Sequence, residues 1–81
     1  MATPPKKTNL LYAKTRELIA LAVAVSVQCD GYIVVHTDAA LKNGATEEEI
    51  IEALGVAIQV KTGSALIYLT RDLDAIKAKS K

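Results

Sequence analysis

An apolar run from Leu18 to Val27, broken only by Ser26, constrains the fold of this chain more than any other feature. A helix through this run would be apolar on every side, which is typical of a helix that is buried all round. The second half of the run alternates valine with alanine or serine, so a buried strand is the competing interpretation. The alanines and the length of the pattern favour a helix from about Leu11 to Gln28.

The apolar content is high for so short a chain. Hydrophobic residues make up 51% of its 81 residues, although aromatic residues contribute only 4% and neither Trp nor Phe is present. A domain of this size buries only about 60% of the surface that its unfolded chain exposes. A monomer therefore has difficulty hiding its apolar side chains, and we expect a homo-oligomer.

Start and stop signals divide the chain into about four helices. Asp30 is a candidate N-cap for a second helix that ends near Lys42, where Asn43-Gly44 supplies a C-cap. Thr46-Glu47-Glu48-Glu49 is a capping box that opens a third helix. Lys61-Thr62-Gly63-Ser64 breaks the pattern and predicts a fourth helix beyond it, with Ser64 or Thr62 as its N-cap. Gly55 indicates a close approach of another backbone. The predicted fold is all-α, a compact bundle of about four helices.

Residues 1–10 are predicted to be a flexible lead-in, and residues 11–81 a single helical domain. The net charge of +1 and the absence of a lysine and arginine stripe argue against nucleic-acid binding. The Leu18–Val27 run is about half the length of a membrane span, so we expect no membrane binding. One cysteine cannot form an internal disulfide, and the first residues lack a signal-peptide pattern, so we expect a soluble protein of the cytoplasm.

Cys29, Tyr32 and His36 form the one chemically suggestive group. On a helix that starts near Asp30, Tyr32 and His36 are one turn apart, and Cys29 projects toward the same side. The positive end of a helix dipole favours a thiolate, and a nearby imidazole can act as its base or ion-pair partner. Spacing alone favours the plainer interpretation, in which a lone cysteine is a small buried hydrophobe.

Metal binding has less support than nucleophilic chemistry. One cysteine and one histidine leave a zinc site two ligands short, and although Glu17 can act as a third ligand, no fourth is evident. We therefore predict that the chain has no metal and no cofactor.

Three segments together resemble the carboxymuconolactone decarboxylase and alkylhydroperoxidase D-like superfamily. They are Lys14 to Ala24 with Glu17, Cys29 to His36, and Ala39 to Ile50 with the Gly44-Ala45-Thr46 turn. The resemblance runs from about Leu11 to Ala78 and implies an all-helical protein that forms trimers or hexamers. In the redox-active branch, two cysteines cycle between dithiol and disulfide, while a glutamate and a histidine relay protons to them.

Carried over to this chain, the resemblance makes Glu17 the relay glutamate, Cys29 the first cysteine and His36 the histidine. Tyr32 stands where the second, attacking cysteine is expected, so an internal disulfide cannot form. A lone thiol can still attack a peroxide and be restored by an external thiol through a sulfenic acid.

The resemblance leaves three function hypotheses. The first is a thiol-dependent peroxidase or disulfide reductase that uses Cys29, His36 and Glu17. The second is an inert, self-assembling subunit, natural or engineered, since family members usually carry a further helical segment before the glutamate-bearing helix. The third is a decarboxylase-like small-molecule enzyme, because that branch of the superfamily dispenses with the cysteine pair.

Overall fold

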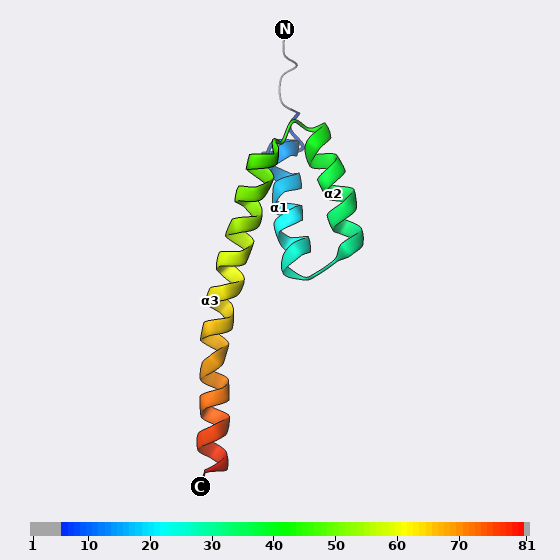
Figure 1. Cartoon of the computed structure of the whole chain (residues 1–81). Helices are drawn as coiled ribbons and strands as arrows, with labels where there is room; N and C mark the ends of the chain where they lie inside the picture. Colours follow the sequence, from blue (N-terminus) through cyan, green and yellow to red (C-terminus); the bar gives the residue numbers. More distant parts are fainter. Residues whose placement is uncertain (1–5, 81) are drawn as a thin grey trace.

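The computed structural model describes residues 6–80 and contains three helices: α1 (Ala13–Ser26), α2 (Asp30–Lys42) and α3 (Glu47–Lys79) (Figure 1). Strands are absent from this part of the chain, apart from an isolated bridge between Lys7 and Tyr12. The all-α prediction is confirmed, and the Leu18–Val27 run is helical rather than extended. Of the predicted lead-in, residues 1–5 lie outside the described part. Residues 6–12 form a turn closed by a 2.6 Å hydrogen bond from the Ala13 N–H to the Lys6 carbonyl.

The prediction of four helices is wrong for the described residues, because the third and fourth helices are one continuous helix, α3. Thr62 does not cap a new helix: its hydroxyl donates to the Ile58 carbonyl at 2.9 Å, one turn back along the same helix. Threonine makes this bond in helix interiors. Gly63 does not have a positive φ, so the chain passes through Lys61–Ser64 without a turn.

The predicted compactness is also wrong. Helix α1 packs against both α2 and α3, while the second half of α3 extends beyond them (Figure 1). The radius of gyration is 18.0 Å and the extents are 71 × 23 × 23 Å. A compact chain of this length would have a radius of gyration of about 12 Å.

The core of the single chain is small. Leu21, Ala40 and Ala45 form its buried centre, with Leu18, Ile50 and Leu54 packed against it. The apolar run in α1 is not buried on every side, because Ile19, Val23 and Val27 remain 50%, 55% and 66% exposed. Gly55 also has no neighbouring backbone, since no heavy atom lies within 4 Å of where its Cβ would be. In a single chain, therefore, the apolar run of α1 and the backbone at Gly55 make only part of the packing contacts that the sequence predicts.

The predicted boundaries between α2 and α3 are confirmed. Gly44 has a φ of 92°, and the N–H groups of Gly44 and Ala45 donate to the carbonyls of Leu41 and Ala40. This pair of bonds is the Schellman motif, which uses a glycine in the left-handed region to end a helix. Thr46 then caps α3: its hydroxyl accepts from the Glu49 N–H at 3.1 Å, and its own N–H donates to the Glu49 carboxylate at 2.9 Å.

Helix α3 is long and apolar enough to cross a membrane by length and composition. Its most apolar 18-residue window has a mean hydropathy of 1.5, and 6% of that window is buried. The same length and composition suit a helix that is covered by another protein chain. The expectation that the chain does not bind membranes stays a prediction.

Candidate functional site

The loop between α1 and α2 places Cys29. The N–H groups of Gln28 and Cys29 donate to the carbonyls of Val25 and Ala24 at 3.2 and 2.9 Å, which makes a second Schellman motif. Gln28 occupies the left-handed position with a φ of 57°, at a cost of about 1–2 kcal/mol for a residue with a side chain. Cys29, rather than the expected Asp30, is the N-cap residue of α2. Its backbone is thus fixed from both sides.

The Cys29 thiol is free and partly buried at the start of α2. Its side chain makes no capping hydrogen bond. The first N–H groups of a helix have no partners inside the helix, so this end of α2 can stabilise a negative charge. A thiolate is the nucleophilic form of cysteine. The position therefore suits a reactive thiol.

Glu17 and His36 form a hydrogen bond between α1 and α2. Glu17 Oε2 lies 2.5 Å from His36 Nδ1, and the two side chains are only 23% and 29% exposed. An ionised carboxylate can only accept hydrogen bonds, so Nδ1 carries the hydrogen in that state and donates it. The ring then presents Nε2 to another partner. This is the arrangement of an imidazole oriented by an acid.

Tyr32 completes the group at His36. The two rings meet edge to face, with centroids 5.8 Å apart and an interplanar angle of 66°. Tyr32 itself is 61% exposed, so its ring covers His36 while facing solvent. Tyr32 precedes His36 by one turn, so this aromatic contact lies on the side of the imidazole toward the start of α2.

The thiol and the imidazole are separated along the helix. The separation of seven positions from Cys29 to His36 corresponds to about 10 Å of rise along the axis of α2. Tyr32 lies between them, about one turn from each. The structure thus brings Glu17, Tyr32 and His36 together, and it places Cys29 at the end of the same helix.

Residues 6–80 contain no group of three or more His, Cys, Asp or Glu side chains that could hold a metal ion. Glu17 and His36 are the two candidate ligands that do meet. Sequence reasoning missed the Lys14–Glu49 ion pair, with a 3.0 Å contact that ties the start of α1 to the first turn of α3. It also missed the positive φ of Gln28, which the residue type does not indicate.

Glu49 has a perturbed acidity. The N–H of Thr46 donates to its carboxylate and Lys14 lies beside it, and these contacts hold the pKa of Glu49 below its ordinary value. The charged form of Glu49 therefore takes part in the joint between α1 and α3.

Comparison with known proteins places the chain in a family. The sequence matches the model of the carboxymuconolactone decarboxylase family over residues 6–72. The chain belongs to this family, within the alkylhydroperoxidase D-like superfamily that the Glu17, Cys29 and His36 pattern resembles.

Three curated relatives are similar to this chain over most of its length. An uncharacterized protein of Haemophilus influenzae is 51% identical over 83% of this chain and 59% of its own length. The uncharacterized protein 4 in the cox locus of Paracoccus denitrificans is 40% identical over 74% of this chain and 54% of its own length. The uncharacterized protein H16_B0147 of Cupriavidus necator is 38% identical over 84% of this chain and 63% of its own length. The chain thus spans little more than half the length of these relatives.

Proposed function

We propose that this chain is a subunit of a thiol-dependent peroxidase with Cys29 as its single reactive cysteine. The observation that carries the proposal is the hydrogen bond between Glu17 and His36, which leaves Nε2 of a partly buried imidazole free on the helix that Cys29 caps. The family resemblance gives the same two residues the role of a proton relay. Cys29 and the relay belong to one helix pair, α1 and α2.

The chemistry requires a peroxide as oxidant and an external thiol as reductant. The Cys29 thiolate attacks one peroxide oxygen, the O–O bond breaks, and the products are a sulfenic acid and an alkoxide or hydroxide. The leaving oxygen takes up a proton to give an alcohol or water. A first external thiol then displaces water to form a mixed disulfide, and a second thiol releases Cys29 as a symmetrical disulfide departs.

In this scheme Nε2 of His36 first accepts the proton of the Cys29 thiol and then returns it to the leaving oxygen, while Glu17 accepts the Nδ1–H and orients the ring. Because Cys29 and His36 are separated by a rise of about 10 Å along α2, the proposal requires the peroxide or a water molecule to bridge them. Tyr32 borders that space and replaces the cysteine that would otherwise resolve the sulfenic acid. In this proposal a reducing compartment such as the cytoplasm supplies the external thiol. The subunits form a homo-oligomer.

Peroxide consumption with dithiothreitol as the reductant tests the proposal. Cys29→Ser should abolish catalysed consumption of cumene hydroperoxide, and His36→Gln should lower its rate by about tenfold or more. Ser26→Ala is the matched control at the same end of the helix pair, and it should keep the wild-type rate. Equal rates for the wild-type chain and Cys29→Ser would refute the proposal, and would favour the inert assembly subunit.

Tyr32→Cys provides a gain-of-function arm. A thiol at this position restores the pair of cysteines and should form an internal disulfide after one turnover, seen as the loss of both free thiols in mass spectrometry. Tyr32→Phe keeps the ring against His36 and should leave the single-cysteine behaviour unchanged. Activity that rises equally in both variants would contradict the assigned role of position 32.

A second candidate, acid–base chemistry on a small carbon substrate as in a decarboxylase, has its own supporting observation. His36 contacts Glu17 and Tyr32, and both contacts are complete without the thiol. In this case Cys29→Ser should keep the turnover of a lactone substrate, whereas His36→Gln should lose it.

A further inference from the structure

Helix α3 has two apolar faces, and one of them has no partner among residues 6–80. Ile50, Leu54 and Ala57 face α1, where Ala57 is 5% exposed. A second set of residues recurs every three or four positions along the whole helix on another face, the spacing of a single helical stripe. This stripe consists of Ile51, Gly55, Ile58, Thr62, Leu66, Leu69, Leu73 and Ile76. Its six large side chains are between 49% and 65% exposed.

The stripe matches itself when the helix is reversed. Turning a second copy of α3 antiparallel about a two-fold axis near Ser64 sets Ile51 opposite Ile76, and Ile58 opposite Leu69. The smaller residues Gly55 and Thr62 then lie opposite Leu73 and Leu66. Large and small side chains alternate in this way in an interdigitated helix–helix contact. A two-fold contact requires this kind of self-complementary surface.

The charges at the two ends of α3 favour the antiparallel direction. Its first turn carries Glu47, Glu48 and Glu49, and its last turn carries Lys77 and Lys79. In the antiparallel pair, Lys77 of one copy lies beside Glu48 of the other, and Lys79 lies beside Glu47. A parallel pair would instead place glutamates next to glutamates and lysines next to lysines. The helix dipoles add to the preference for the antiparallel pair.

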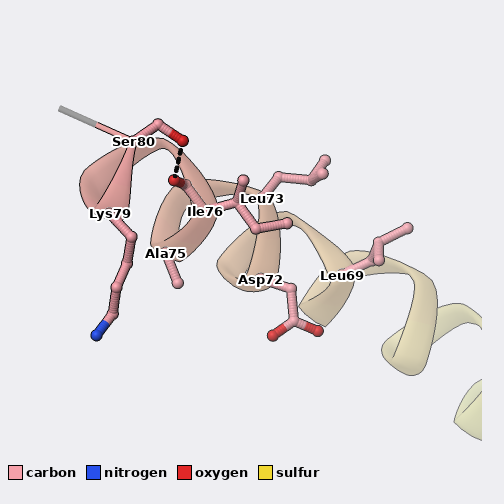
Figure 2. Close-up of a pocket in the computed structure, with 7 residues that line it drawn as sticks. All are labelled: Leu69, Asp72, Leu73, Ala75, Ile76, Lys79 and Ser80. Carbon is pink, nitrogen blue, oxygen red and sulfur yellow. Dashed lines mark hydrogen bonds between the residues drawn. The ribbon is translucent and has the colours of Figure 1, made fainter.

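The side chains near the end of α3 are arranged for such a contact. Figure 2 shows Leu69 and Leu73 extending to one side of the helix, while Asp72 and Lys79 extend to the other. The charged groups thus border the apolar stripe and do not interrupt it. Gly55 leaves an open space, with no heavy atom within 4 Å of a Cβ built there, and a leucine from a second copy would fill that space.

The area of the stripe is close to the lower limit for a specific contact. Fully burying one leucine or isoleucine side chain removes roughly 60–120 Å² of apolar surface from water. Twelve such side chains, half to two-thirds exposed, together with the flanking residues of a helix about 50 Å long, approach about 1,000 Å². This is the lower limit for a specific interface.

We propose that α3 pairs antiparallel with α3 of a second copy of this chain along the Ile51–Ile76 stripe. A contact of this kind brings a two-fold axis, so the assembly contains an even number of subunits. A dimer, or a hexamer with both three-fold and two-fold axes, has such an axis, and a cyclic trimer does not. The pairing specifies one interface of the homo-oligomer in the proposed function. It does not depend on peroxidase chemistry, and its test measures the mass of the assembly and not its activity.

The first test compares two neighbouring residues on α3 by light scattering after size exclusion. Leu66 and Ile67 are 65% and 70% exposed, but only Leu66 lies on the stripe. Leu66→Glu should reduce the mass of the assembly at least twofold, whereas Ile67→Glu, the matched control, should keep the wild-type mass. A wild-type monomer or trimer, or the same loss of mass in both variants, overturns the proposal.

The second test reads the direction of pairing. In a Cys29→Ser background, a sample that mixes Ile51→Cys and Ile76→Cys chains is treated with a short bismaleimide. The expected product is a dimer that contains one chain of each variant, while either variant alone should not cross-link to itself. Cross-linking of either variant to itself overturns the proposal. So does a wild-type chain that does not assemble in buffer but floats with phosphatidylcholine–phosphatidylglycerol vesicles.

Discussion

At the residue scale, Glu49 performs two structural tasks with one carboxylate. One oxygen accepts the Thr46 N–H and closes the capping box, and the other contacts Lys14 on α1 at 3.0 Å. Both contacts favour the charged form, with the backbone hydrogen bond from Thr46 the larger cause of the lowered pKa. The side chain therefore links the start of α3 to α1 in a way that depends on pH.

Replacing Glu49 by glutamine should make this dependence visible. Because the pKa of Glu49 is lowered in the folded chain, its contribution is fully present above its ordinary value of 4.5 and is lost as the pH falls through the lowered value. Glu49→Gln should therefore unfold at a lower temperature than the wild-type chain at pH 7. The difference should shrink as the pH is lowered from 7 toward 3, as followed by circular dichroism.

Glu48→Gln is the control, because Glu48 occupies the same helical turn outside the capping box. Its unfolding temperature should differ from that of the wild-type chain by less, and the difference should change little between pH 7 and pH 3. A Glu49→Gln difference that stays constant over this range would contradict the assigned role of the carboxylate.

Residue types predicted several of these local features and missed others. The side chains of Thr46 and Glu49 directly favour the capped start of a helix, and the absence of a side chain at Gly44 directly favours its left-handed conformation. The pairing of Glu17 with His36 came from the family resemblance, since their separation of 19 residues has no local meaning. Gln28 could not be predicted, because glutamine has no preference for a positive φ and the surrounding bonds impose it.

At the element scale, the continuity of α3 is the main difference from the sequence-based expectation. Lys61-Thr62-Gly63-Ser64 contains residues that commonly end and begin helices, and a fourth helix followed from them. Such residues end a helix only when the turn has a lower free energy than the continued helix. Here Thr62 bonds back to Ile58, so the residue expected to cap a new helix instead continues the old one.

Gly63→Ala tests whether this helix is continuous. In a continuous helix, alanine is favoured over glycine by about 0.5–1 kcal/mol, and the site has room for a Cβ. The variant should therefore be more stable in urea unfolding by about that amount. Gly44→Ala is the opposing control, since its φ of 92° makes a side chain costly, and it should lose about 1 kcal/mol. Destabilisation by Gly63→Ala would indicate a turn at residues 61–64.

At the scale of the whole molecule, the described chain leaves most of its large apolar side chains exposed. The buried residues of the described part are few and mostly alanine: Ala13, Leu21, Ala24, Ala40, Ala45 and Ala57. An alanine contributes little apolar area, so these residues alone supply a small part of what a domain needs to be stable. The composition predicted an excess of apolar side chains, but only the structure shows that it extends along α3 and divides into two faces.

Stability that comes from contacts between subunits must depend on protein concentration. Each tenfold rise in concentration favours an association step by about 1.4 kcal/mol, so the midpoint of thermal unfolding should rise as the chain is concentrated. We expect an increase of several degrees for the wild-type chain between about 2 and 200 µM, followed by circular dichroism, because so small a domain gains several degrees per kcal/mol. Ile67→Glu should show the same rise, and Leu66→Glu should show a smaller one with a lower midpoint at every concentration. A wild-type midpoint that does not change with concentration would mean that the small core of Leu21, Ala40 and Ala45 stabilises the fold without a second copy.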